Sequence, residues 1–173
     1  MHIRPEQIDD RASISDLLCH AFPTPEEALL GERLRESGSA PVALVAIEED
    51  DHGEQDVVGH VVFSPVELEP QAPWPGLGLA PLAVRPQAQR RGIGSQLVQA
   101  GLEACRASGA GFVVVLGDPA YYSRFGFVRG SQFGLVNEYG VDEEFMALEL
   151  KPGCLSYGGL VRYHAAFAAF GPG

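Results

Sequence analysis

The spacing of apolar residues predicts a helix near the start of the chain. Apolar side chains recur at every third or fourth position over residues 14–22, which is the period of an α-helix with one buried face. This helix is expected to begin after Asp9 or Asp10, either of which can cap it, and to end near Ala21. Residues 2–4, which precede it, predict a short first strand.

A second helix and a β-hairpin are expected next. Thr24-Pro25-Glu26-Glu27 has the form of a capping box with proline at the first helical position, and Gly38 is a suitable end for the helix. Residues 42–47 and 57–63 are runs of β-branched and apolar residues, separated by the acidic stretch 48–54. These two strands predict an antiparallel hairpin with a solvated turn.

The middle of the chain predicts a strand, a helix and a second strand in that order. Residues 65–76 contain four prolines and are interpreted as a loop. Residues 78–84 predict a strand in which Pro81 interrupts pairing, because proline has no amide proton to donate. Residues 93–107 have helical periodicity, and residues 112–117 predict a buried strand. A crossover helix favours parallel pairing of the two strands.

The last part of the chain is expected to contain one short helix and two strands. Asp118 is a suitable N-cap for a helix that Gly126 ends. Residues 145–150 and 159–163 are interpreted as an antiparallel pair. The apolar tail 165–170 is expected to dock either on its own domain or on a second subunit.

Composition narrows the function classes. The chain has 173 residues, 46% of them hydrophobic, so a single domain over residues 1–173 is expected. A formal net charge of −11 argues against binding to nucleic acid or to an anionic membrane, both of which need a basic surface. No apolar run approaches the length of a membrane span, and no signal sequence is recognised. The three cysteines are widely spaced and lack a CxxC pair, which argues against disulfides and a metal and favours the cytoplasm.

The most informative stretch is the basic, glycine-spaced turn Gln89-Arg90-Arg91-Gly92-Ile93-Gly94, which joins an apolar strand to an amphipathic helix. Amides in the first turn of a helix have no intrahelical partner and lie at the positive end of the helix dipole. The glycines keep Cβ atoms away, and the two arginines together with Arg85 are expected to make the local charge positive. The turn therefore predicts a site for a phosphorylated ligand. Leu97 at the third glycine position excludes a Rossmann dinucleotide turn.

This turn resembles the acyl-CoA pyrophosphate signature Gln/Arg-x-x-Gly-x-Gly/Ala of the GCN5-related N-acetyltransferases, the GNAT family. A second block, Tyr122-Ser-Arg-Phe-Gly-Phe127, resembles the later Tyr-x-x-x-Gly-Phe element of that family. Two motifs in the right order are more specific than either alone. The resemblance is strongest over residues 57–130 and implies an α/β (α+β) fold. Such a fold has a mixed, mostly antiparallel central sheet, flanked by helices, with one splayed parallel strand pair.

The resemblance also implies how acetyl-CoA would bind as the acyl donor. Its phosphates would lie at the basic turn, and the backbone of the strand before the turn would bond the pantetheine arm. The cofactor-binding residues implied in this way are Leu82, Ala83, Val84, Gln89, Arg90, Arg91, Gly92, Ile93, Gly94 and Ser95. The acyl-CoA-binding core would span about residues 78–130.

Acetyl transfer to an amine needs a proton donor for the departing thiolate and a neutral amine. Tyr122 is the candidate acid, because a phenol with a pKa of about 10 stays protonated at neutral pH. In the alternative interpretation Tyr122 only packs beneath the cofactor arm. Glu67, Asp118, His60 or an ordered water could act as the base, although Asp118 is also a suitable helix cap and His60 a suitable core residue.

The sequence thus predicts an N-acetyltransferase that moves an acetyl group from acetyl-CoA to a primary amine. The acceptor would be a small molecule or a peptide, and the amine would attack directly within a ternary complex. The alternative is a non-catalytic module that binds acyl-CoA. Neither interpretation needs nucleic acid, a membrane or a metal, and both are compatible with a homodimer.

Overall fold

The computed structural model describes residues 1–38 and 40–169. Its strands are β1 (His2–Pro5), β2 (Val42–Glu49), β3 (Gln55–Glu69), β4 (Gly76–Val84), β5 (Phe112–Leu116), β6 (Val128–Arg129), β7 (Leu135–Asn137), β8 (Phe145–Glu149) and β9 (Gly159–Tyr163). Its α-helices are α1 (Arg11–Ala21), α2 (Glu26–Glu36), α3 (Ile93–Ala107) and α4 (Pro119–Tyr122). Short 3-10 helices are η1 (Ile8–Asp10), η2 (Pro86–Ala88), η3 (Ser123–Phe125), η4 (Gly130–Phe133) and η5 (Ala165–Ala169).

Packing divides the chain into two compact units. The first unit comprises Met1–Phe63 and Ala80–Ala104, and the second comprises Ser64–Leu79 and Cys105–Gly173. Strands β3 and β4 each contribute residues to both units. The single domain expected from length and composition stays a prediction.

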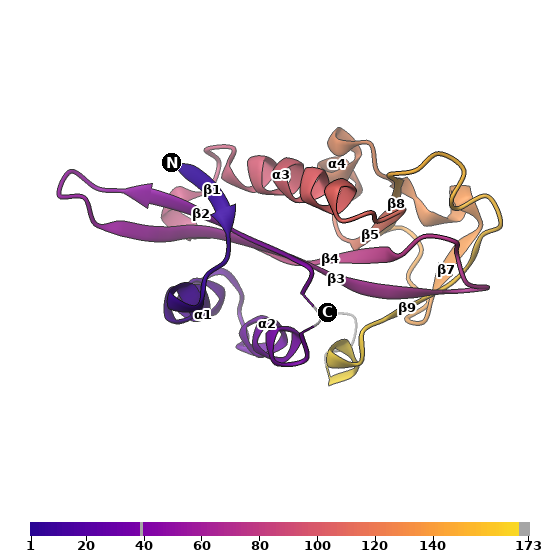
Figure 1. The fold of residues 1–173 in the computed structure, drawn as a ribbon, viewed down its shortest axis with the longest axis horizontal. Helices are drawn as coiled ribbons and strands as arrows, with labels where there is room; N and C mark the ends of the chain where they lie inside the picture. Colours follow the sequence, from indigo (N-terminus) through magenta and orange to yellow (C-terminus); the bar gives the residue numbers. More distant parts are fainter. Residues whose placement is uncertain (39, 170–173) are drawn as a thin grey trace. The chain divides into compact units, whose positions relative to one another are not determined.

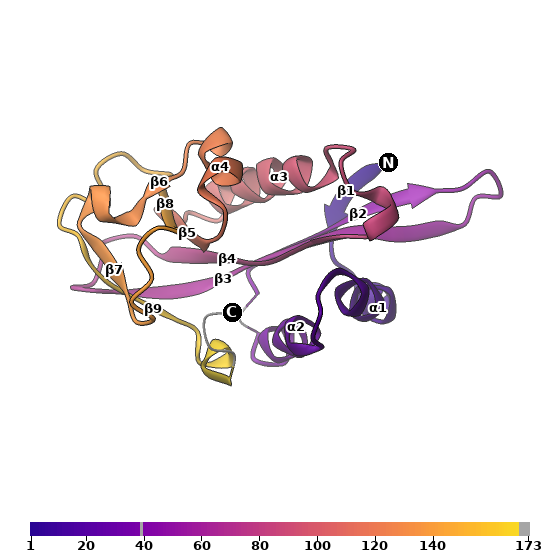
Figure 2. The same ribbon diagram turned by 180° about the vertical axis from the view of Figure 1, so that it is seen from behind.

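The first unit is built on the antiparallel strands β1, β2 and β3. Helices α1 and α2 cover one face of these strands, and α3 covers the other (Figures 1 and 2). Ile14, Leu17 and Leu18 of α1 are buried against Val45 of β2 and Ala83 of β4. These contacts confirm the helical period that the sequence shows over residues 14–22.

The helix starts differ in detail from the expected caps. Asp10 is at the N-cap position of α1, but its carboxylate accepts hydrogen bonds from Arg4 and from the amide of Gln7 instead of capping the helix. At the start of α2, Pro25 occupies the N-cap position, whereas the sequence predicted it at the first helical position, which is one residue later in the helix. The apolar period and the turn residues thus predicted both helices correctly, whereas no side chain caps either helix at its N-cap residue.

Strand β3 is longer than the sequence predicted, because it continues through Pro65 to Glu69. Its pairing with β2 ends at Phe63, and its pairing with β9 begins at Val66. Pro65 lies between these two pairings, so its missing amide proton costs no ladder hydrogen bond there. The prediction that residues 65–69 form a loop was therefore wrong.

In the second unit β4 and β5 form the predicted parallel pair. The pairing joins Gly76–Gly78 to Phe112–Val114, and both strands continue beyond it. The pairing thus ends before Pro81, as expected from the proline. A second parallel pair, which the sequence did not predict, joins β7 to β9.

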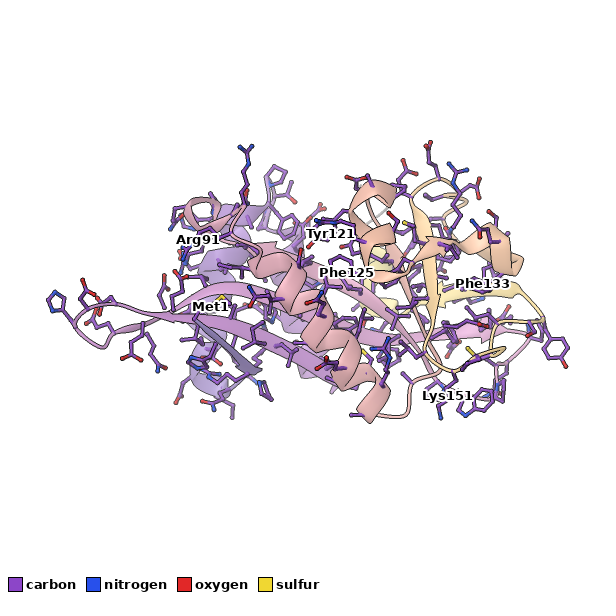
Figure 3. All side chains as sticks on the ribbon, turned by 90° about the horizontal axis from the view of Figure 1, so that it is seen from above. Met1, Arg91, Tyr121, Phe125, Phe133 and Lys151 are labelled. Carbon is purple, nitrogen blue, oxygen red and sulfur yellow. The ribbon has the colours of Figure 1, made fainter. Side chains whose placement is uncertain are left out.

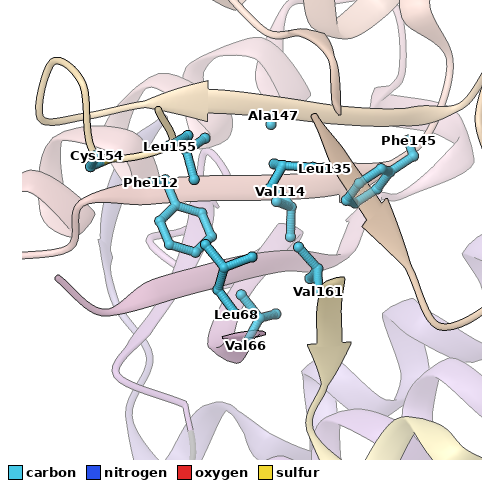
Figure 4. Close-up of a cluster of buried hydrophobic side chains, with 10 residues drawn as sticks. All are labelled: Val66, Leu68, Phe112, Val114, Leu135, Phe145, Ala147, Cys154, Leu155 and Val161. Carbon is cyan, nitrogen blue, oxygen red and sulfur yellow. The ribbon is translucent and has the colours of Figure 1, made fainter. Parts of the chain in front are cut away.

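The predicted antiparallel pairing of residues 145–150 with residues 159–163 was wrong. Strand β8 pairs with β5 over all five of its residues and also with β6, whereas β9 pairs with β3 and β7. Figure 4 shows the buried cluster that these pairings create, in which side chains of β3, β5, β8 and β9 point toward one another. Burial of this shared face stabilises the observed order of strands.

The C-terminal segment packs on its own unit. Phe167 of η5 is buried, and the centroid of its ring lies 5.6 Å from that of Tyr163. Phe170, the other aromatic residue of the tail, is outside the described residues. None of the described helices is long and apolar enough to cross a membrane.

Candidate active site

The basic turn in the first unit has a strained backbone. After β4 the chain passes through η2 and reaches Arg90, whose φ of 61° is in the left-handed region although Arg90 is not a glycine. Gly92 has a φ of 81°. A left-handed conformation at a non-glycine residue costs on the order of 1–2 kcal/mol and is concentrated at functional sites. The strain at Arg90 thus singles out this turn.

Unpaired amides follow at the start of α3. The first amide of the helix to find a backbone acceptor is that of Gln96, which donates to the carbonyl of Gly92 at 3.0 Å. The amides of Ile93, Gly94 and Ser95 precede it in the first turn, where an α-helix offers no carbonyl to them. Three of the sequence-predicted residues therefore present donors at the positive end of a 15-residue helix.

Charge at the turn is lower than the sequence suggested. Arg91, labelled in Figure 3, donates from Nη1 and Nη2 to both carboxylate oxygens of Glu48 on β2, at 3.2 and 2.5 Å. Arg90 is exposed and makes no ion pair with any described residue. The expectation of a plainly positive turn is therefore corrected, because a carboxylate already neutralises one of its two arginines.

Arg85 has a structural role. Its side chain donates to Asp16 of α1 at 2.9 Å, to Asp56 of β3 at 3.2 Å and to the carbonyl of Val57 at 2.9 Å. Its backbone amide donates to the carbonyl of Val58 at 2.9 Å. These bonds fix the end of β4 to α1 and β3, so Arg85 positions the turn without adding free charge to it.

The strand that leads into the turn carries the residues predicted for the cofactor arm. The side chain of Ala83 is buried with α1, while Leu82 and Val84 are half-buried. Gln89 donates from Nε2 to the carbonyl of Val84 at 3.1 Å. This hydrogen bond therefore connects the turn to the end of β4, and it gives the Val84 carbonyl a partner in Gln89.

In the second unit Tyr122 lies on the short helix α4. Asp118 caps this helix by accepting a hydrogen bond from the amide of Ala120 at 2.8 Å, as the sequence predicted. A Cβ atom on Gly117 would lie 2.4 Å from the Tyr122 ring, so only glycine fits there. The Tyr122 side chain is buried to 8% exposure, and Phe127 meets its ring at a centroid distance of 5.7 Å.

The neighbours of Tyr122 are aromatic. Tyr121 and Phe125 lie side by side in Figure 3, with ring centroids 5.4 Å apart, and the Tyr121 ring meets that of Tyr122 at 5.0 Å. Burial raises the pKa of Tyr122 well above its usual range, and Tyr121 adds to the rise. Within the described part of the chain the Tyr122 hydroxyl makes no hydrogen bond. It is thus a protonated and unengaged donor.

The three side chains considered as the general base differ in burial and in hydrogen bonding. His60 has no exposed surface, and its Nε2 donates to Glu6 at 2.8 Å, so it is a core residue. Burial lowers the pKa of His60, although the bond to Glu6 opposes this. Asp118 is committed to its cap, whereas Glu67 is exposed on β3, opposite Arg162.

Sequence reasoning missed the acidic partners of the arginines. Glu48 and Asp56 face each other across the β2–β3 hairpin; Glu48 belongs to the acidic run 48–54 that was interpreted as a solvated turn, and Asp56 follows it by two residues. The sequence did contain a signal for these partners, because an antiparallel hairpin places the residues on either side of its turn opposite each other, and acids stand on both sides of this turn. The described residues include no group of three His, Cys, Asp or Glu side chains that could hold a metal ion.

Comparison with known proteins agrees with this geometry. The family model described as "Acetyltransferase (GNAT) family" matches residues 11–127. The uncharacterized N-acetyltransferase YhbS of Escherichia coli (strain K12) is 39% identical over 98% of this chain and 100% of its own length. The uncharacterized N-acetyltransferase YjhQ of the same organism is 36% identical over 80% of this chain and 76% of its own length.

Two solved structures extend the comparison to the fold. The crystal structure of YhbS from Escherichia coli in complex with CoA has a TM-score of 0.89 at 39% identity and covers 98% of this chain and 93% of its own. A GNAT family acetyltransferase from Brucella melitensis in complex with acetyl-CoA has a TM-score of 0.77 at 34% identity, covering 96% of this chain and 97% of its own. The family resemblance and the mixed, mostly antiparallel sheet predicted from the sequence are thereby confirmed: this chain belongs to the GNAT family of acetyltransferases.

Proposed function

We propose that this protein transfers an acetyl group from acetyl-CoA to a primary amine of a small molecule or peptide, by direct attack within a ternary complex. The observation that carries the proposal is the row of unpaired amides of Ile93, Gly94 and Ser95 at the start of α3, directly after the strained turn. Family membership supports it, as do the CoA and acetyl-CoA complexes of the two similar proteins.

In this proposal the pyrophosphate of acetyl-CoA accepts hydrogen bonds from the amides at the start of α3. Gly92 admits the phosphate closely, and the unpaired guanidinium of Arg90 contributes charge. Gln89 holds the turn, and Arg91 contributes once a phosphate replaces Glu48. The backbone of Leu82, Ala83 and Val84 bonds the pantetheine arm, beside the Val84 carbonyl that already accepts a hydrogen bond from Gln89.

The reaction forms a C–N bond and breaks a C–S bond. The neutral amine attacks the thioester carbonyl carbon, the nitrogen of the tetrahedral intermediate releases a proton to solvent, and the intermediate then expels the CoA thiolate. Tyr122 gives its phenolic proton to that sulfur and is reprotonated from solvent. Its raised pKa keeps the phenol protonated throughout the neutral range, so the proton is present at every turnover.

The amine must lose a proton before it can attack, because an alkylamine with a pKa near 10 is only about one part in a thousand neutral at pH 7. Burial of His60 and the capping bond of Asp118 remove both from this role. We propose Glu67 or an ordered water as the proton acceptor. Replacing Glu67 with glutamine distinguishes them, because only a direct base would lower kcat about 100-fold or more.

A non-catalytic acyl-CoA-binding module is the alternative function. The intact Tyr122 block favours the enzyme, since a pure binding module needs no proton donor. The test is the release of CoA thiol from acetyl-CoA with spermidine, n-butylamine, an aminoglycoside and a peptide with a free N-terminus, with product confirmed by mass spectrometry. Acetylation of any of these excludes the binding module. Tight acetyl-CoA binding without turnover of any amine would favour it.

We also propose a cytoplasmic location, which the three free cysteines support. The proposal includes no nucleic-acid or membrane partner, and it is compatible with a homodimer. Sedimentation velocity measures the oligomeric state directly.

A further inference from the structure

A cavity of about 560 Å³ lies in the second unit, where the end of β3 and the loop 70–75 meet the start of β4. Val66, Leu68 and Phe112 line it, and all three belong to the buried apolar cluster shown in Figure 4. A volume of this size is typical of small-molecule sites, in which an apolar lining surrounds a few polar groups. The cavity can therefore hold the apolar part of a small ligand.

Close packing holds the wall of this cavity in place. A Cβ atom on Gly76 would lie 2.1 Å from the ring of Phe112, and one on Gly111 would lie 2.6 Å from Cβ of Trp74. The amide of Gly111 also donates a hydrogen bond to the carbonyl of Pro75 at 2.8 Å. Only glycine permits these approaches, so the backbone around the cavity is fixed before a ligand binds.

The rim of the cavity carries a carboxylate without a partner. Glu67 lines the cavity, is exposed on β3, and makes no hydrogen bond or ion pair with any described residue. Arg162 lies opposite Glu67 on β9, but its Nε and Nη2 donate to the carboxylate of Glu69 at 3.0 and 3.3 Å. The carboxylate of Glu67 is therefore available to a cation.

The other groups at the rim also favour a cation over an anion. Pro73 and Pro75 line the cavity and have no amide hydrogen, so they offer no backbone donor to an anion. The indole of Trp74 lines the cavity as well and is 38% exposed. Aromatic faces attract positive charge, and Nζ of Lys151, which does not line the cavity, lies 5.3 Å from the centroid of this ring.

We propose that this cavity binds an organic ammonium ion that carries an apolar group. The ammonium lies between the carboxylate of Glu67 and the indole of Trp74, and the apolar group packs on Val66, Leu68 and Phe112. An alkylamine with a pKa near 10 is an ammonium ion at neutral pH, so it meets both rim groups in its charged form. The inference concerns binding alone and does not depend on the proposed acetyl transfer.

Tryptophan fluorescence tests this inference, because Trp74 is the only tryptophan of the chain and lines the cavity. Titration with benzylamine should change the emission in a saturable way. Benzyl alcohol, which has the same shape without the charge, should bind at least about 5-fold more weakly. Glu67→Gln should weaken benzylamine binding about 3- to 10-fold. The matched control is Glu144→Gln, which removes an exposed acid outside the cavity and should leave binding unchanged.

The absence of a saturable change with benzylamine would overturn the inference. An equal affinity for benzyl alcohol, or undiminished binding by a folded Glu67→Gln protein, would overturn it as well. These titrations contain no acetyl-CoA, so their failure is distinguishable from failure of the proposed function.

Trp74→Leu removes the reporter together with the aromatic face, so its binding of benzylamine is measured by isothermal titration. The affinity should fall about 2- to 5-fold, and an unchanged affinity would overturn the placement of the ammonium beside the indole. Steady-state kinetics at saturating acetyl-CoA then separate two sources of the ligand. A raised KM for benzylamine in Trp74→Leu identifies the bound ammonium as the acceptor, whereas an unchanged KM identifies a second amine that binds apart from the reaction.

Discussion

Removing the hydroxyl of Tyr122 tests the chemical step directly. Tyr122→Phe keeps the ring, which is 8% exposed and fits against Gly117 and Phe127, and so preserves the packing of α4. The hydroxyl makes no hydrogen bond to any described residue, so its removal leaves no partner unsatisfied. The free energy of unfolding should therefore change by less than about 1 kcal/mol.

The rate should respond far more strongly than the stability. A general acid contributes about 10²- to 10⁴-fold, so kcat should fall by that factor, which corresponds to about 3–5 kcal/mol of activation free energy. The KM for acetyl-CoA should stay within about twofold, because the ring still packs as before. Thiol release from acetyl-CoA at saturating amine measures both constants.

The pH dependence gives a second criterion. Burial raises the pKa of Tyr122 above the usual value of about 10, so ionisation of the phenol should lower the wild-type kcat only above about pH 10. The mutant should lack this alkaline decline. A mutant with the wild-type kcat and an unchanged alkaline limb would refute the assignment, and a raised KM with normal kcat would support the packing role instead.

Three further substitutions test the supporting structure. Gly101→Ala would place a Cβ atom 2.2 Å from the buried ring of Phe63, so thermal melting should show a loss of about 1–3 kcal/mol, although alanine is the better helix former. Arg90→Gly relieves a φ of 61° and should raise the unfolding free energy by about 1 kcal/mol in urea titration while weakening acetyl-CoA binding. Because burial lowers the folded-state pKa of His60, the unfolded state binds the extra proton, and stability should fall below about pH 6.5 by up to about 1.4 kcal/mol per pH unit. This slope should flatten in His60→Asn, and an unchanged slope would mean that His60 is not its source.

The elements that hold the phosphate turn were predictable because their signals are local. The helical period of residues 93–107, the buried strand at residues 112–116 and the glycine spacing between residues 89 and 94 can each be recognised within one short window. The parallel pairing of β4 and β5 followed from the crossover helix alone. Local pattern and chain connectivity were sufficient for this part of the fold.

Pairings between distant segments were not predictable in the same way. Strands β8 and β9 are neighbours in sequence, but each is more stable against another strand, because their apolar faces complete the core around Val114 and Val161. The Arg91–Glu48 ion pair joins residues 43 positions apart, and it forms only because the hairpin places Glu48 beside the turn. The sequence shows which residues carry charge, whereas the fold decides which charges meet.

Isothermal titration of acetyl-CoA into the wild type and into Gly94→Asp tests the central claim most directly. The substitution puts a carboxylate at the start of α3, where the phosphates are proposed to bind, and adds both repulsion and bulk. Gln99→Asp, an exposed position farther along α3, adds the same charge as a control. The account predicts that the wild type and the control bind acetyl-CoA, and that Gly94→Asp remains folded by circular dichroism but shows no binding heat. Undiminished binding by a folded Gly94→Asp protein would contradict it.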